Sequence, residues 1–493
     1  MTPAFSPHVA VVGGGISGLA GAHRLRTLLG WDARITLIER TQRLGGVLRT
    51  VELAGVPMDV GAEAFLARRP EVPALAAELG LADQLVHPSS ASAPVRAGGH
   101  TVPLPAGTFL GVPGSTARLD GLLSGPALTR VAGERDRPLH WSGKDLAVGE
   151  LLRDRFGDEL TDRLVDPLLS GVYAGRVDGL GLRATIPALA AALDAGAPSL
   201  TAAADTLTRE SGFSAHRVGV LSTPSSPVFG ALRGGYRVLI DALRRASGAE
   251  IRLGLPVRAL TRLPGTDRRA DADADGAGGW RLEIGSATAP EALDVDAVLL
   301  AVPAPALRKL LADIAPAASG AAGAVELASP VVVALAYRAE DASTLPESSG
   351  VLIAADEPLR AKAFTHSSRK WPHLAPDATD GLLRLRASLG RAGDAATVRV
   401  PDDELVARVR ADLATLTGIA AAPVEAHVRR WGGGLPQYGV GHGNLVDELE
   451  RAVSELPGVA VAGAMLHGVG VPACIATARA AAERLACGQP VSG

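Results

Sequence analysis

Closely spaced glycines near the start of the chain have the types and spacing that hold a phosphate group. The segment Gly13-Gly14-Gly15-Ile16-Ser17-Gly18 fits the pattern G-x-G-x-x-G. Its first glycine permits a tight turn, its second lets the backbone approach a pyrophosphate, and its third allows close helix packing. Glu39 lies 21 residues after Gly18, where a carboxylate can accept both hydroxyls of a ribose. Together they predict a dinucleotide site, against the alternative of a plain glycine turn beside a surface glutamate.

The glycine pattern needs a strand before it and a helix after it, and the sequence supplies both. The apolar run Val9–Val12 stops at the glycines and is typical of a buried parallel strand. Helical spacing over Leu19–Leu29 predicts a helix, and Ile35–Ile38 predicts a second strand that ends at Glu39. Residues 9–39 therefore form one βαβ unit, whose helix offers free N–H groups to phosphates.

Different dinucleotide cofactors share this glycine pattern, and a second group of motifs indicates which of them is bound. Glu39-Arg40 leads to Gly45-Gly46, where two glycines let the backbone pass close to a long cofactor. Asp59-Val60-Gly61-Ala62-Glu63 follows. This arrangement resembles the amine-oxidase superfamily of flavoproteins. The resemblance implies FAD, with its flavin end near Gly61, Ala62, Glu63 and Ala64.

The carboxyl-terminal region resembles the same superfamily. Val459–Ala462 predicts a strand, and Pro472 stands in the first turn of a helix expected over Ala473–Ala486. The resemblance implies that the helix amino terminus stabilises negative charge on a reduced flavin, which places Val469, Gly470 and Val471 beside it. The alternative is a terminal packing helix. Cys474 is expected to be a small buried side chain rather than a covalent attachment point, so FAD is predicted to bind non-covalently.

Further segments narrow the resemblance to one branch. The most specific is Asp166–Gly175, which reads Asp-Pro-Leu-Leu-Ser-Gly-Val-Tyr-Ala-Gly; the others are Leu182–Pro187, Phe229 with Gly234-Gly235, Ser368–Pro372 and Gly463–Pro472. Together they resemble the bacterial protoporphyrinogen/coproporphyrinogen oxidase family. The resemblance implies a six-electron oxidation of a porphyrinogen in which O₂ reoxidises FAD three times and forms three H₂O₂. In Gram-positive-type members the substrate is coproporphyrinogen III, and only the resemblance favours it here over protoporphyrinogen IX.

The propionates of such a substrate need cationic partners. Residues Asp59–Ala64 are called the flavin segment below. Arg69, which follows this segment, is the first candidate, with a solvated surface arginine as the alternative. Arg176, Arg183 and Tyr173, in or beside the Tyr-Ala-Gly signature, are further candidates, with surface exposure or packing as the alternatives. In relatives, a valine at the place of Val257 holds the adenine and a tryptophan at the place of Trp431 lies near the flavin. No clustered Cys/His pattern points to a metal.

The pattern of elements predicts an α/β fold in which the chain passes repeatedly between parts. A Rossmann-type FAD-binding domain is expected from 1–65, 228–302 and 440–493, interleaved with a mixed-sheet substrate domain from 66–87, 185–227 and 303–439. Residues 88–184 are expected to form a helical subdomain of amine-oxidase type. A helix is predicted over 71–87, paired strands over Val257–Leu263 and Trp280–Ile284 with a loop between them, and strands of a second sheet over Val331–Tyr337, Gly350–Ile353 and Leu383–Leu389.

Charge and cysteine usage limit the partners. A net charge of −3 offers no basic field to nucleic acid, and two cysteines fit a reducing, cytoplasmic setting. A porphyrinogen and O₂ are the expected partners, with a transient contact to ferrochelatase possible in such a pathway. The charged helical stretch Leu146–Ala204 predicts at most peripheral membrane contact, and glycines and Pro472 interrupt the apolar stretch Val459–Ala478.

Two other functions stay open on the sequence. Another superfamily oxidase, such as an amine oxidase or a carotenoid desaturase, would keep the FAD site. A low aromatic content of 3% disfavours the paired aromatics of an amine site. A non-catalytic flavin-binding protein would hold FAD without oxidising any porphyrinogen.

Overall fold

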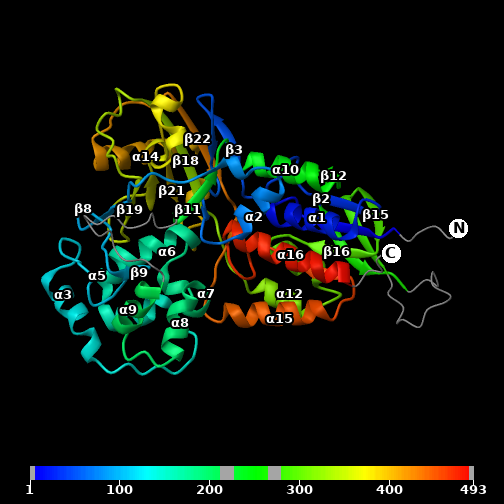
Figure 1. Cartoon of the computed structure of the whole chain (residues 1–493), viewed down its shortest axis with the longest axis horizontal. Helices are drawn as coiled ribbons and strands as arrows, with labels where there is room; N and C mark the ends of the chain where they lie inside the picture. Colours follow the sequence, from blue (N-terminus) through cyan, green and yellow to red (C-terminus); the bar gives the residue numbers. More distant parts are fainter. Residues whose placement is uncertain (1–5, 211–226, 265–278, 488–493) are drawn as a thin grey trace.

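The computed structural model describes residues 6–210, 227–264 and 279–487, and most of the predicted loop between the paired strands lies outside these ranges. Figure 1 shows three parts: a sheet with long helices on the right, a second sheet at the upper left and a group of helices at the lower left. Each part has its own apolar core. The predicted α/β class with interleaved parts is confirmed.

The first part is built on a five-stranded sheet whose paired strands all run parallel. Its order is β12 (Glu250–Leu253), β2 (Arg34–Glu39), β1 (His8–Val12), β16 (Ala297–Leu300) and β24 (Val459–Val461). The strands come from the two ends and the middle of the chain, as the sequence predicts. Because parallel strands end at one edge of a sheet, the residues that follow β1, β2, β16 and β24 are brought to the same side.

Alternate residues of these strands face two separate cores, as expected for a sheet that is buried on both faces. One face packs against α1 (Ile16–Leu29), α10 (Arg237–Ser247) and α16 (Val471–Cys487). The other packs against α11 (Ala304–Leu311), α12 (Pro316–Gly323), α15 (His442–Ser454) and an antiparallel meander of β13 (Val257–Arg262), β14 (Trp280–Ser286) and β15 (Ala289–Val295). The predicted pairing of β13 with β14 is confirmed.

The second part is a seven-stranded mixed sheet. Its order is β22 (Glu425–Arg430), β18 (Val331–Arg338), β21 (Leu382–Leu389), β20 (Ala363–Thr365), β19 (Gly350–Ile353), β7 (Val95–Ala97) and β8 (His100–Val102). Helix α14 (Asp402–Thr417) packs on one face. The hairpin of β3 (Thr50–Leu53) and β4 (Val56–Asp59) packs on the other through Leu53, Met58 and Val60. The strands predicted for the second sheet are confirmed as β18, β19 and β21.

The helical part extends further along the chain than predicted. It contains α3 (Gly125–Ala132), α4 (Val148–Phe156), α5 (Asp158–Leu160), a π-helical turn over Thr161–Val165, α6 (Asp166–Tyr173), α7 (Leu182–Thr185), α8 (Pro187–Asp194) and α9 (Leu200–Glu210). Leu189, Leu193, Leu200 and Leu207 lie in the same apolar core as α4 and α6. The predicted boundary at residue 184 is therefore too early, because α8 and α9 bury their apolar faces against this core.

The predicted helix over 71–87 was wrong in its second half. Helix α2 ends at Glu78 (Glu71–Glu78), and Gly80 two residues later has φ +69° and lets the Leu81 N–H donate to the Ala76 carbonyl at 2.7 Å. Leu85–Val86 then forms β6, which pairs with β11 (Phe229–Leu232), and β11 also pairs with β5 (Phe65–Leu66). This small sheet links the flavin segment to the loop before α10.

None of the helices within the described ranges is both long enough and apolar enough to cross a membrane.

Candidate functional site

The first glycine motif forms the turn between β1 and α1, at the carboxyl edge of the parallel sheet. Gly13 has φ +108°, and a methyl group on it would stand 2.2 Å from the Ala301 carbonyl oxygen. A methyl group on Gly18 would stand 1.8 Å from the Gly13 carbonyl oxygen. Between them, Ile16 and Ser17 open α1. The turn is therefore closed to side chains and leaves the helix N–H groups free for an anion.

The second glycine pair lies directly against the first. The Gly45 N–H donates to the Gly14 carbonyl at 2.8 Å, and Gly15 and Gly45 form an isolated parallel bridge. A methyl group on Gly46 would meet the Gly15 Cα at 3.1 Å. The two motifs, predicted separately from the sequence, thus form one cradle of bare backbone.

Glu39 lies at the end of β2 and is buried. One carboxylate oxygen accepts from the Gly14 N–H at 2.8 Å, and the other accepts from the Thr41 N–H at 2.8 Å. The Leu255 N–H donates to the Glu39 carbonyl at 3.0 Å, which brings the strand that begins at Val257 close to this carboxylate. Arg40 is exposed. The placement of Glu39 and Val257 suits the ribose and adenine roles predicted for them.

The flavin segment passes between the cradle and the second sheet. A methyl group on Gly61 would stand 1.9 Å from the Val47 carbonyl oxygen, so a side chain has no room there. The Trp431 indole N–H donates to the Val60 carbonyl at 2.9 Å. Ala62 packs against the core of the parallel sheet, and Ala64 packs against a separate small cluster. The structure therefore brings Trp431 into contact with this segment, and its place beside a flavin stays a prediction.

Glu63 is the centre of a buried charge cluster. Its carboxylate lies 2.9 Å from the Lys370 Nζ and 3.4 Å from the Arg386 guanidinium, and it accepts from the Ser367 hydroxyl at 3.1 Å. Burial alone would raise the pKa of Glu63, but Arg386 and Lys370 outweigh it and lower that pKa to about 2. Arg386 also donates to the Gly61 carbonyl at 2.9 Å. The cluster thus fixes the flavin segment to the second sheet.

Asp59, four residues before Glu63, is also a buried carboxyl group, but its pKa is raised rather than lowered. It accepts from the Thr50 hydroxyl at 2.6 Å and from the Tyr236 N–H, just before α10, at 3.2 Å. Burial raises the pKa of Asp59 to about 7, and the nearby Glu63 charge adds to the rise. Two neighbouring carboxyl groups therefore take different protonation states, with Glu63 ionised and Asp59 partly protonated near neutral pH.

We expect Asp59→Asn to change how stability depends on pH. Because the pKa of folded Asp59 is raised from 3.8 to about 7, the stability it contributes is full below 3.8 and is lost as pH rises to about 7. Wild-type protein should lose up to about 1.4 kcal/mol per pH unit in this window relative to the Asn variant, which does not titrate. Urea unfolding of both proteins across the window measures the difference. Parallel pH profiles would show that Asp59 is ionised throughout.

Helix α16 runs parallel to α1 with its amino terminus at the cradle. The Cys474 thiol contacts the Ser17 hydroxyl, and a methyl group on Gly21 would lie 3.7 Å from the Ala478 carbonyl. Burial raises the pKa of the Cys474 thiol to about 11, which keeps it neutral. Val469 and Gly470 precede the helix, and Val471 begins it. Two helix amino termini therefore converge on one site.

Tyr173 connects the helical part to the loop before α16. Its ring lies 5.6 Å from that of Tyr438, and Tyr438 in turn donates to the Ala464 carbonyl at 2.6 Å and accepts from the Gly468 N–H at 2.8 Å. Val469 packs against the helical core that contains Tyr173. This packing places Tyr173 at the carboxyl-terminal side of the site.

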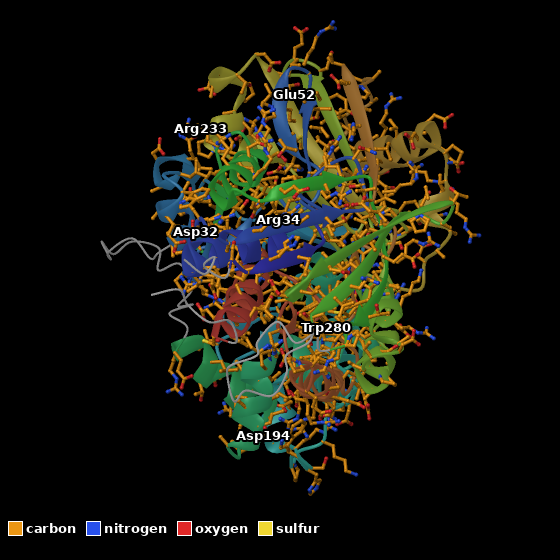
Figure 2. The ribbon with its side chains drawn as sticks, turned by 90° about the vertical axis from the view of Figure 1, so that its right-hand side faces the viewer. Asp32, Arg34, Glu52, Asp194, Arg233 and Trp280 are labelled. Atoms are coloured by element: carbon orange, nitrogen blue, oxygen red, sulfur yellow. The ribbon has the colours of Figure 1, made fainter. Side chains whose placement is uncertain are left out.

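The predicted arginines lie at different places. Arg69 is exposed and forms an ion pair with Glu71. Arg176 is exposed just after α6. Arg183 pairs with Asp194 at 2.8 Å and stacks on the Trp141 ring, and Figure 2 shows Asp194 at the opposite end of the molecule from Glu52. Arg183 therefore belongs to the helical part, and of the predicted arginines Arg69 lies closest in sequence to the flavin segment.

The structure reveals cations that sequence reasoning missed. Arg43 lies beside the second glycine pair, where its guanidinium donates to the Leu44 carbonyl at 3.1 Å and to the Gly46 carbonyl at 2.6 Å. Burial together with the charges of Arg49 and Arg429 lowers the pKa of Arg43. Lys370 and Arg386 were missed as partners of Glu63. For Arg43 and Arg49 the only signal in the sequence was the presence of several arginines around Gly45-Gly46, and such arginines are common on protein surfaces.

This arrangement fits a dinucleotide. The cradle has no room for added side chains at Gly13 and Gly18. Two helix amino termini and the charges of Arg43, Arg49 and Arg429 favour a pyrophosphate. Glu39 is placed for a ribose. Within the described residues, no group of His, Cys, Asp and Glu side chains is arranged to hold a metal ion.

Comparison with known proteins agrees with this geometry. Residues 16–486 match the family described as flavin containing amine oxidoreductase. Coproporphyrinogen III oxidase of Mycobacterium tuberculosis is 46% identical, over 95% of this chain and 95% of the relative. That of Bacillus subtilis is 30% identical, over 96% and 97%. The crystal structure of a putative protoporphyrinogen oxidase from Exiguobacterium sp. superposes with a TM-score of 0.82 at 30% identity, covering 98% of this chain and all of that one. The chain therefore belongs to the flavin-containing amine oxidoreductases, in the branch of the protoporphyrinogen and coproporphyrinogen oxidases.

Proposed function

We propose that this protein oxidises coproporphyrinogen III to coproporphyrin III with non-covalently bound FAD, using three O₂ and forming three H₂O₂, as a step of haem biosynthesis in the cytoplasm. The observation that carries the proposal is the single cradle formed by both glycine motifs, Glu39 and the start of α16, in a chain 46% identical over 95% of its length to a coproporphyrinogen III oxidase. The balance is six electrons and six protons removed from the porphyrinogen, two of each per O₂.

The residues of this chain would hold the cofactor and favour its reduced form. Glu39 would bind the ribose, and the first turn of α1 with Arg43 would bind the pyrophosphate. The amino terminus of α16 at Val471 would stabilise negative charge on the reduced ring. When bound, FAD accepts two electrons at a time from the substrate and passes them to O₂. The neutral, buried Cys474 thiol supports binding without a covalent bond.

The protein's part in the chemistry is to orient the substrate and exclude water, since no acid–base triad is required for this reaction. Arg69 remains our first candidate for a propionate or for charge beside the flavin, with Tyr173 and Arg176 as further contacts. Arg183 is the weakest candidate, because it lies in the helical part and is held there both by Asp194 and by the Trp141 ring. We propose O₂ and the porphyrinogen as partners, with a transient contact to ferrochelatase that would receive the product, and at most peripheral membrane contact.

The test is to supply coproporphyrinogen III and protoporphyrinogen IX separately in air and to follow porphyrin fluorescence and H₂O₂. We expect faster formation of coproporphyrin, with three H₂O₂ per porphyrin. Faster oxidation of protoporphyrinogen would change the substrate and keep the reaction class. No enzyme-dependent oxidation of either would overturn the proposal and make amines the next substrates to assay.

A further inference from the structure

A pocket lies beside the small sheet of β5, β11 and β6, with both residues of β6 in its lining. It has a volume of about 350 Å³ and is lined by Leu85, Val86, His87, Arg233, Pro372, His373 and Ala378. Arg233 directly follows β11, and its N–H donates to the Gln84 carbonyl at 2.8 Å. Figure 2 shows Arg233 on the outside of the molecule. Every side chain that can carry charge in this lining is cationic or an imidazole.

The guanidinium of Arg233 carries a charge that no carboxylate of the described residues pairs with. Among the residues that the structure describes, its guanidinium has no carboxylate within ion-pair distance, unlike Arg237 four residues later, which pairs with Glu52. A cation left unpaired at a concave surface keeps its capacity to bind an anion, with a fork of donors that matches carboxylate and phosphate oxygens.

The two histidines add hydrogen-bond donors at the same place. His87 Nδ1 lies 3.1 Å from the Phe229 carbonyl oxygen, which can only accept, so Nδ1 carries the proton and Nε2 is left for a ligand. His373 Nδ1 is buried and has no hydrogen-bond partner among the described residues. Burial lowers the pKa of His373, and the Arg233 charge lowers it further. A bound anion would reverse this second effect and satisfy the free nitrogen.

We propose that this pocket binds a small oxyanion, a carboxylate or a phosphate, through Arg233, His87 and His373. No residue of the glycine motifs lines the pocket, and the proposal does not depend on the proposed substrate. The pocket does reach the cradle's support, because His373 also lines a small cavity of about 20 Å³ beside Asp59 and Glu63. A water in that cavity could instead satisfy His373, whereas Arg233 lines only the larger pocket. Arg233 therefore decides the test.

The experiment is isothermal titration of the flavin-loaded protein with inorganic phosphate and, separately, with propionate, at constant ionic strength set by KCl. We expect a dissociation constant of order 1 mM or tighter for one of them, weakened roughly tenfold or more in Arg233→Gln because a charge-assisted contact is lost. Arg244→Gln, which removes an exposed arginine on α10, is the control and should bind as wild type does. Binding of neither probe, or equal binding by Arg233→Gln, would overturn the proposal.

A second readout concerns the proton that His373 should gain. The titratable and charged groups that share a lining with His373 are Arg233 and His87 in the larger pocket, and Asp59 and Glu63 in the smaller cavity; of these, the charges of Arg233 and Glu63 act on its pKa. Titrations in two buffers with different ionisation heats should show proton uptake on binding, and His373→Asn should reduce it. Phosphate binding alone would identify a free phosphate as the ligand. Propionate binding that is weakened by added coproporphyrin III would identify a carboxylate carried by a tetrapyrrole.

Discussion

Gly18→Ala is expected to yield protein that folds but retains little flavin. The added methyl group would stand 1.8 Å from the Gly13 carbonyl oxygen, and neither atom can move without opening the turn that begins α1. Overpacking of this kind costs ~1–3 kcal/mol or more, and each ~1.4 kcal/mol lost from binding weakens it tenfold. We expect the ratio of flavin to protein after purification to fall roughly tenfold, measured by the absorbance of flavin released on denaturation.

Gly320→Ala is the matched control for this variant. Gly320 lies within α12, and a methyl group on it would have no atom within 4 Å. Alanine in a helix is ~0.5–1 kcal/mol more stable than glycine, so this variant should keep its flavin and unfold at a slightly higher temperature. Full flavin content in Gly18→Ala would mean that the turn tolerates a side chain and that the cradle is not where the dinucleotide binds.

Much of the fold could be predicted because local pattern and final environment agree. The apolar runs at residues 9–12 and 35–38 become parts of β1 and β2, strands buried on both faces, as continuous apolar sequence indicates. The third strand of the meander, β15 (Ala289–Val295), was not predicted, because five of its seven residues are exposed and are small or polar, with no clear alternation. Its position is set by pairing with β14, which is a tertiary effect.

The site was predictable where backbone geometry dictates the residue type. Glycines whose added methyl groups would collide with backbone leave a signature in the sequence, which is why Gly13, Gly18, Gly46 and Gly61 could be named in advance. Long-range partners leave none. Lys370 and Arg386 lie about 300 residues from Glu63 along the chain and reach it only because β21 and the short helix Ser367–Lys370 pack against the flavin segment.

Glu63→Gln is expected to have the largest effect on stability. Glutamine keeps the shape of the side chain but leaves Lys370 and Arg386 without the carboxylate that neutralises both. Removing one partner from a buried ion pair costs ~3–5 kcal/mol, because the remaining charge stays in a site of low polarity. The variant should therefore unfold at a markedly lower urea concentration near neutral pH. Replacing Glu483, which pairs with Arg24 at the surface, by glutamine should change stability by no more than ~0.5 kcal/mol.

The pH dependence distinguishes a lost charge from a packing defect. Because the pKa of folded Glu63 is lowered from 4.5 to about 2, its contribution is complete above 4.5 and is lost as pH falls toward 2. The stability gap between wild type and Glu63→Gln should stay wide above 4.5 and narrow below it, since protonated glutamate resembles glutamine. A gap that persists unchanged into acid would mean that glutamine disturbs the packing around the flavin segment, and the two cations would then not be held by charge. A gap that closes identifies Glu63 as the ion that joins the flavin segment to the second sheet.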